Sequence, residues 1–222
     1  MSVRARVVSL LGIVLVPAVA YNVPYVSDYA SVIIAAALAI ILVRAKPASP
    51  LPELGLARPP RVWRALALGV AIGLGLLLLN RVFLSPLIEQ ITGSRRDLSA
   101  FDSLRGNWRA LLAILPPLWL SAGLCEEVVY RGYLIPQTAM LFGKSRLAQP
   151  VALLFAATLF ALAHWYQGVS GMLITGTLGV IFGALFLQQR RNLWANVAAH
   201  ITADTASLIL ITSNLDRPLG GG

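Results

Sequence analysis

Charged residues are scarce in this sequence. They make up 12% of the 222 residues, whereas hydrophobic residues make up 58%. A soluble globular domain usually carries roughly 25% charged residues and is about half apolar. The mean hydropathy of +0.77 also lies on the hydrophobic side. This shortage of charge argues against a soluble domain and predicts an all-α, polytopic transmembrane helical bundle.

Cysteine and histidine are rare as well. The single cysteine, Cys125, excludes a disulfide within the chain, and the carboxylates beside it disfavour a nucleophilic thiolate. The two histidines, His164 and His200, lie in different apolar segments, and the sequence has no His-Glu-x-x-His motif. The sequence therefore does not predict a zinc protease of the type that uses this motif.

About seven apolar segments are predicted to cross the membrane, and the count becomes eight if the polar stretch 93–107 adds a half-span. A span needs about 20 apolar residues, so the second and fifth segments are short. Pro116-Pro117 predicts a kink in the fourth segment. The predicted segments are 7–26, 29–43, 65–84, 108–134, 151–165, 172–187 and 193–212.

The chain is expected to fall into three regions. Residues 1–107 would form N-terminal transmembrane helices and an interfacial segment, residues 108–212 a core, and residues 213–222 a disordered tail. The start of the chain has two interpretations. Ala18-Val19-Ala20, after a basic and then an apolar stretch, has the form of a signal-peptide cleavage site. An uncleaved first span is favoured, because the later spans do not require a cleaved signal.

The net charge of +9 comes mainly from arginines in short loops. Basic residues spread in this way are typical of topology signals, so the lipid bilayer is an expected partner and nucleic acid is not. With seven spans, the basic N-terminus, residues 44–64, residues 144–146 and residues 190–191 fall on one side. A multi-pass protein of the cell membrane with a cytoplasmic N-terminus is therefore predicted, and 93–107 is a partial exception.

Two adjacent carboxylates, Glu126 and Glu127, and an arginine, Arg131, lie inside the apolar fourth segment. Each bare charge at such a depth costs at least ~2.5–3.5 kcal/mol, so these residues need partners or a function. In an α-helix Glu127 and Arg131 share a face, whereas Glu126 is rotated by about 100°. We therefore expect Glu127 to be structural and Glu126 to face a cavity, where it suits a general base.

Polar residues recur in two later segments. His164 follows Phe160 by four positions, and Asn196, His200 and Asp204 are also spaced by four. The last three form one polar stripe on a helix. Such a stripe is expected to face the protein interior or a hydrated cavity and not lipid.

Taken together, three patterns resemble the motifs of the CPBP family of intramembrane proteases, which includes CAAX proteases and bacteriocin-processing enzymes. The resemblance covers about residues 108–211, half of the chain, and the first three segments show no motif. It implies a metal-independent endopeptidase without a cofactor. The expected substrates are peptides or membrane-anchored proteins, with prenylated CAAX proteins as one option. The patterns are Glu126-Glu127-x-x-x-Arg131, Phe160-x-x-x-His164 and His200-x-x-x-Asp204.

The resemblance also implies roles for individual residues. Glu126 and His164 would activate a water molecule, and His200 and Asp204 would support the oxyanion. Asp204 donates a hydrogen bond only when protonated, so its alternative role is to orient His200, which would donate as an imidazolium. The residues expected to support the site are Glu127, Arg131, Asn196 and Phe160.

Other functions and simpler structural roles remain open at this point. The same glutamates and histidines are acceptable ligands for Zn²⁺. Glu126 and His164 would also suit a proton relay in a proton-coupled carrier, and a non-enzymatic immunity or scaffold protein is a third alternative. In structural terms, Glu127–Arg131 could be only a buried ion pair, and His200–Asp204 only a polar contact between helices.

Overall fold

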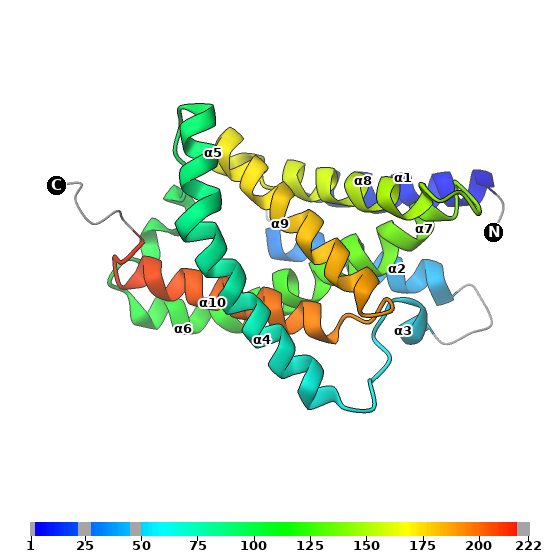
Figure 1. Ribbon diagram of the computed structural model, residues 1–222, viewed down its shortest axis with the longest axis horizontal. Helices are drawn as coiled ribbons and strands as arrows, with labels where there is room; N and C mark the ends of the chain where they lie inside the picture. The colour runs from blue at the N-terminus through cyan, green and yellow to red at the C-terminus, as the bar shows by residue number, and fades with distance from the viewer. Residues whose placement is uncertain (1–2, 22–27, 45–49, 217–222) are drawn as a thin grey trace.

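The computed structural model describes residues 3–21, 28–44 and 50–216, and the regular elements of these residues are all helical. The helices form an elongated bundle, with α3 toward one end and α5 toward the other (Figure 1). The α-helices are α1 (Val3–Tyr21), α2 (Asp28–Arg44), α3 (Pro50–Glu53), α4 (Val62–Leu79), α5 (Ser85–Thr92), α6 (Trp108–Leu118), α7 (Ile135–Ala139), α8 (Ala148–Ala163), α9 (Gly168–Gln188) and α10 (Trp194–Thr212). The π-helical segments are η1 (Asn80–Leu84) and η3 (Trp119–Leu134), and the 3₁₀ helices are η2 (Ser99–Leu104) and η4 (Trp165–Gln167).

Three helices of the described residues are long and apolar enough to cross a membrane, namely Val62–Thr92, Trp108–Ala139 and Trp165–Gln188. Two shorter apolar helices, Val32–Leu42 and Ala148–Ala163, correspond to the two segments that the sequence predicts to be short. The prediction of an all-α fold with transmembrane-length helices is confirmed.

Neither the polar stretch 93–107 nor the last predicted span, 193–212, forms one of the long apolar helices. Residues 93–107 form a loop and the short helix η2, so this stretch contributes no apolar helix. Helix α10 is not among the long apolar helices, because polar residues interrupt its sequence. Within the described residues, length and composition therefore identify three of the predicted spans as long apolar helices and two more as shorter ones. The last predicted residues of the chain, 217–222, lie outside the described residues, as do residues 22–26 of the first segment.

Two helices continue past their predicted ends. Elements α4, η1 and α5 form one helix that ends at Thr92 and not at residue 84, and α6, η3 and α7 form one that ends at Ala139 and not at residue 134. Pro86 and Pro136 do not stop these helices, and each lies where a π-helical segment changes to an α-helix. A 31-residue helix is about 46 Å long, so it extends beyond a hydrocarbon core of ~30 Å.

The segment after Pro116-Pro117 is π-helical. Both prolines lie inside α6, and the helix widens at Trp119. The Ser121 hydroxyl donates a hydrogen bond of 2.7 Å to the carbonyl of Pro117. At the prolines the helix changes to the wider i→i+5 turn, a geometry often found at functional sites, and the kink stays a prediction. This change applies to the whole of η3, which carries both carboxylates of the site.

Segment η3 lies at the centre of the largest hydrophobic core. Its buried residues Val128, Val129 and Tyr133 belong to the same cluster as Ala35 and Ala39 of α2. Helices α2, α8 and α10 all contact η3, and α8 also packs on α9. The helices that carry the polar motifs are therefore held against one another through this core.

Helix α10 packs along α4 at two glycines. A Cβ atom at Gly69 would lie 2.4 Å from the carbonyl oxygen of Ala195, and one at Gly73 would lie 2.5 Å from that of Ala199. Such distances leave no space for a side chain, which is how small residues let membrane helices approach closely. The contact sets the depth and rotation of α10, and with them the direction of its polar stripe.

We predict that Gly73→Ala destabilises the protein by roughly 1–3 kcal/mol, the usual cost of overpacking, because the new methyl group forces α10 away from α4. Thermal unfolding in detergent measures this effect. Gly75→Ala on the same helix is the matched control, because a Cβ at Gly75 would meet nothing within 4 Å. Equal unfolding temperatures for the two variants would contradict the importance of this contact.

Candidate functional site

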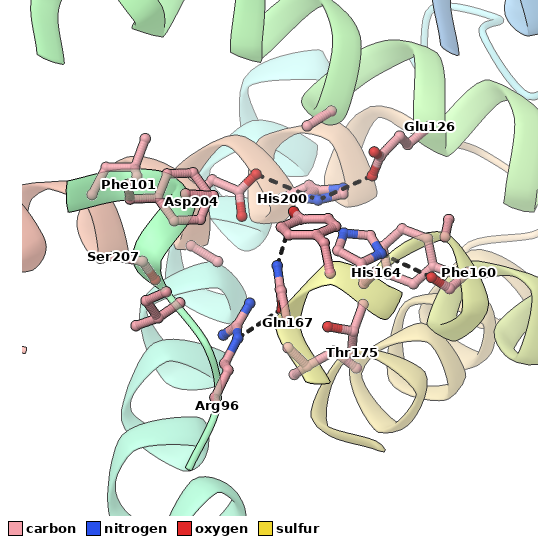
Figure 2. A pocket seen from close by; sticks show the side chains of 18 of the residues that line it. Arg96, Phe101, Glu126, Phe160, His164, Gln167, Thr175, His200, Asp204 and Ser207 are labelled. Atoms are coloured by element: carbon pink, nitrogen blue, oxygen red, sulfur yellow. Dashed lines mark hydrogen bonds and ion pairs between the residues drawn. The ribbon is translucent and has the colours of Figure 1, made fainter. Parts of the chain in front are cut away.

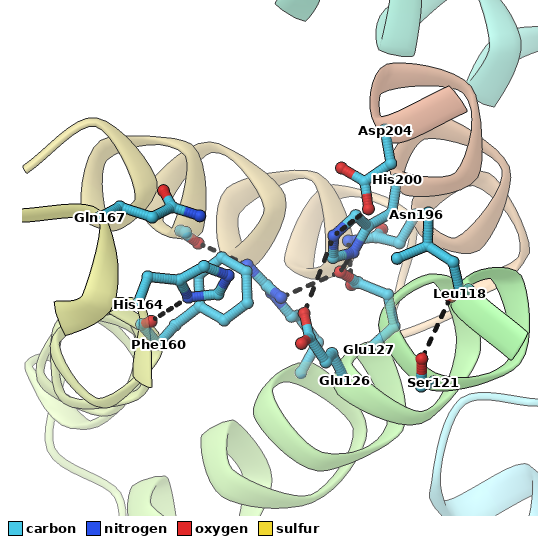
Figure 3. A network of polar contacts seen from close by, with 12 residues as sticks. Leu118, Ser121, Glu126, Glu127, Phe160, His164, Gln167, Asn196, His200 and Asp204 are labelled. Carbon is cyan, nitrogen blue, oxygen red and sulfur yellow. Dashed lines mark hydrogen bonds and ion pairs between the residues drawn. The ribbon is translucent and has the colours of Figure 1, made fainter. Parts of the chain in front are cut away.

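The carboxylate of Glu127 is fully buried and binds three side chains (Figure 3). Its Oε1 accepts a hydrogen bond of 2.9 Å from Arg131 and lies 2.8 Å from Nδ1 of His200. Its Oε2 accepts a hydrogen bond of 3.2 Å from the amide of Asn196, which also donates to the carbonyl of Phe182 at 2.8 Å. A carboxylate can only accept hydrogen bonds, so its partners are donors. Because Asn196 and His200 belong to α10, the single carboxylate of Glu127 joins η3 to α10.

Arg131 is the buried counter-charge of Glu127. The Arg131–Glu127 ion pair is the contact that the four-residue spacing predicts. The guanidinium lies 4.5 Å from the ring centre of Phe160 and 5.2 Å from that of Phe182. It also donates to the carbonyl of Gly179 at 3.4 Å. The aromatic rings and the carbonyl oxygen offset part of the cost of burying the cation.

His200 lies between three carboxylates. Its Nδ1 carries a proton, because the Glu127 oxygen that it faces can only accept. Its Nε2 lies 3.8 Å from Oε2 of Glu126 and 3.6 Å from Oδ2 of Asp204. The imidazole also stacks on Phe182, with ring centres 5.2 Å apart. One nitrogen of His200 is therefore held by a structural contact, while the other points toward Glu126 and Asp204.

A hydrogen bond to the backbone also fixes the position of the ring proton of His164. Its Nδ1 lies 2.8 Å from the carbonyl oxygen of Phe160, which can only accept, so Nδ1 carries the proton. Nε2 is left with a lone pair and makes no hydrogen bond within the described chain. The Phe160 ring contacts both imidazoles, with ring centres 4.8 Å from His164 and 6.1 Å from His200.

Glu126, His164, His200 and Asp204 line one cavity of about 1460 Å³ (Figure 2). Their side chains come from η3, from the end of α8 and from α10. Buried Oε2 of Glu126 has no hydrogen-bond partner within the described residues. A buried carboxylate oxygen without a hydrogen bond is costly, and Nε2 of His200 lies 3.8 Å from this atom.

The prediction that Glu126 and Glu127 point in different directions is correct only in part. Glu126 lines the cavity and Glu127 is buried behind it, as expected. However, both carboxylates approach the same imidazole, His200, from its two nitrogens. The expected separation assumed α-helical turns, whereas η3 is π-helical. The structure gives no hydrogen bond or ion pair that joins His164 to Glu126 in the described chain, so any cooperation between them requires a molecule in the cavity.

Three residues of the cavity wall escaped the sequence reasoning. Arg96 donates from Nε to the side-chain oxygen of Gln167 at 2.8 Å, and Gln167 donates to the hydroxyl of Tyr166 at 2.9 Å. Burial lowers the pKa of Arg96, and the nearby Tyr166 and Asp204 act in the opposite direction. Of the three, only Gln167 has a signal in the sequence, because its amide stands at the start of an apolar segment. The structure shows that this amide is buried. Arg96 carried no such signal among the other charges of its loop.

The potential metal ligands of the described residues are not arranged around a common metal position. Within residues 3–21, 28–44 and 50–216, no group of three or more His, Cys, Asp or Glu side chains is arranged to hold a metal ion. The zinc alternative therefore gains no support from the geometry of these side chains.

We predict that Glu127→Ala lowers the free energy of unfolding by about 3–5 kcal/mol, because it leaves the buried guanidinium of Arg131 unpaired. Unfolding in detergent monitored by circular dichroism measures the loss. Glu126→Gln is the matched comparison, since Glu126 makes no ion pair with Arg131, and it should change the stability much less. A larger loss for Glu126→Gln than for Glu127→Ala would reverse the assignment of the structural carboxylate.

Comparison with known proteins connects this geometry to one family. The model of the family described as Type II CAAX prenyl endopeptidase Rce1-like matches residues 108–206. The matched region includes η3, α8, α9 and most of α10, and with them all the polar motif residues. The chain matched no curated protein and no solved structure. Residues 108–206 are therefore a domain of the Rce1-like type II CAAX prenyl endopeptidase family, a family of membrane proteases, and the chain is a multi-pass membrane protein that carries this domain.

Proposed function

We propose that this protein is an intramembrane endopeptidase that hydrolyses peptide bonds in peptides or membrane-anchored proteins, using water activated by Glu126 and His164. Family membership already implies membrane protease activity on peptide or protein substrates. The observation that carries the finer proposal is the convergence of four polar side chains from three apolar elements on one cavity. Such groups are costly in a membrane unless they serve a hydrated site.

The proposed reaction begins at Glu126. Its Oε2, which makes no hydrogen bond within the described residues, accepts a proton from a water molecule, while the free Nε2 of His164 accepts the second hydrogen bond of the same water. The water oxygen attacks the carbonyl carbon, a C–O bond forms, and the carbonyl oxygen takes up the negative charge. The C–N bond then breaks, and the leaving amine takes the proton held by Glu126. Water is the only co-reactant, and the products are a carboxylate and an amine.

His200 is the proposed donor to the oxyanion. When Nε2 is protonated it can donate into the cavity, and it lies only 3.8 Å from the carboxylate of Glu126. A carbonyl oxygen bound there would place its carbon within reach of a water held by Glu126. Asp204, 3.6 Å from the same nitrogen, would orient the ring and stabilise its charge. This assignment needs no protonated Asp204.

The wider organisation is also a proposal. We infer seven spans, a cytoplasmic N-terminus, a catalytic core at 108–212 after an N-terminal part at 1–107, and a tail at 213–222. Support for the topology comes from contacts between loops that the positive-inside rule assigns to one side. The backbone N–H of Leu193 donates to the carbonyl of Gly55 at 2.8 Å, which brings the loop before α10 to the segment after α3.

We predict that Glu126→Gln lowers kcat for a prenylated CAAX peptide by about 10²–10⁴-fold, because the amide cannot accept the proton from water. A peptide-cleavage assay with purified protein in liposomes measures the rate. Glu53→Gln, which changes an exposed carboxylate of α3, should retain the wild-type rate.

The same assay separates the alternatives. A chelator should leave the wild-type rate unchanged, whereas a zinc enzyme would lose activity and recover it with added Zn²⁺. If the wild-type protein and Glu126→Gln cleave equally, the proposed role of Glu126 is wrong. Proton-coupled uptake in liposomes without any peptide cleavage would instead favour a carrier.

The topology generates a separate prediction. A reporter that is active only in the cytoplasm should be active when fused after residue 192 and inactive when fused after residue 94, because seven spans place these sites on opposite sides. The reverse pattern would invert the orientation, and activity at both sites would rule out seven spans.

A further inference from the structure

Arg96 is a cation in the wall of the catalytic cavity. It belongs to the loop between α5 and η2, outside the apolar helices, and its side chain is half-buried. Figure 2 shows its guanidinium pointing toward Gln167 and the interior of the cavity. The same cavity is lined by Glu126, His164 and His200.

The guanidinium uses only part of its hydrogen-bonding capacity. Its Nε donates to Gln167, and its two terminal nitrogens make no hydrogen bond or ion pair within the described residues. Asp204 is near enough to act on Arg96 electrostatically, but the two form no ion pair. The two terminal nitrogens therefore form an unoccupied fork of the kind that binds a carboxylate through two parallel hydrogen bonds.

The surrounding residues hold Arg96 in this orientation. Its backbone N–H donates to Glu89 at 3.3 Å, and the neighbouring backbone N–H of Asp97 donates to the carbonyl of Gln167 at 3.0 Å. A Cβ at Gly171 would lie 2.2 Å from Cβ of Gln167 and 3.4 Å from Cγ of Arg96, so the glycine leaves the space that both side chains occupy. The loop is thus joined to α5 and to the start of α9, and the position of Arg96 is built into the fold.

We propose that Arg96 is a substrate-positioning residue that binds a carboxylate of the peptide in the catalytic cavity. This inference rests on the proposed function and adds a specificity determinant from outside the 108–206 domain. The bound group belongs to the occupant of the cavity, because the guanidinium points inward. The group assigned to Arg96 is the C-terminal carboxylate, because every peptide with a free C-terminus carries it whatever its side chains are. An acidic side chain offers the same chemistry and is distinguished by the test.

The experiment uses the full-length protein in liposomes and three versions of one prenylated CAAX peptide. The first has a free C-terminus and no acidic side chain, the second is its C-terminal amide, and the third is the amide with one glutamate beside the scissile bond. The variants are Arg96→Gln, which removes the charge, and Arg96→Lys, which keeps the charge but loses the fork. Arg109→Gln is the matched control, because Arg109 is an exposed arginine outside the cavity.

We expect the wild-type protein to prefer the acid over the amide by about tenfold or more in kcat/KM, the effect of a typical charge-assisted hydrogen bond. Arg96→Gln should abolish this preference by raising KM for the acid toward KM for the amide, and its continued cleavage of the amide shows that the variant is folded. Arg96→Lys should retain part of the preference, and Arg109→Gln all of it. If only the glutamate-containing amide is favoured, the bound group is an acidic side chain and the commitment to the C-terminus is wrong.

Two results overturn the inference as a whole. If the wild-type protein cleaves acid and amide equally, Arg96 does not bind the C-terminal carboxylate. The same conclusion follows if the preference for the acid survives Arg96→Gln. Both results leave the proposed protease function intact. Binding of fluorescent acid and amide peptides to Glu126→Gln keeps the test independent of catalysis. If the wild-type protein cleaves none of the peptides, the protease proposal fails for this substrate class, and the ratio of the two binding constants still decides the role of Arg96.

Discussion

A charged group without access to water must find all its partners inside the protein, and Glu127 meets this constraint with donors from two separate elements. Arg131 comes from the same helical segment, whereas Asn196 and His200 come from α10. Moving α10 away would remove two of the three donors to the buried carboxylate, Asn196 and His200, and a buried polar group left without a partner costs about 1–3 kcal/mol. The position of η3 relative to α10 is therefore defined by hydrogen bonds of fixed direction as well as by non-directional apolar packing.

This constraint organises the neighbouring cavity. Since Glu127 holds one nitrogen of His200, the other nitrogen faces Glu126 and Asp204. The π-helical turns of η3 allow two adjacent carboxylates to reach the same imidazole, one as a structural acceptor and one with an oxygen that makes no hydrogen bond within the described residues. A similar division holds for His164, whose Nδ1 is engaged by a backbone carbonyl and whose Nε2 is free. At both histidines the scaffold uses one nitrogen and leaves the other for chemistry.

The N-terminal half also contributes to the site, although it carries none of the family motifs. Helix α4 sets the position of α10 through the close contacts at Gly69 and Gly73. The loop after α5 brings Arg96 to the cavity and is held there by Gln167 and Glu89. Residues before the family domain thus shape the cavity, although its reactive groups belong to the family domain.

Much of this organisation followed from the sequence. Low charge and long apolar runs require helices, because a membrane interior leaves every backbone hydrogen bond to be made within the segment. The spacing of four in Glu127–Arg131 predicted the ion pair, and the polar stripe of Asn196, His200 and Asp204 identified the inward face of α10, because both are properties of a single helix. The tertiary structure alone decided which nitrogen of His200 is free and that Arg96 reaches the cavity. These features depend on contacts between elements far apart in the chain, and no local periodicity encodes such contacts.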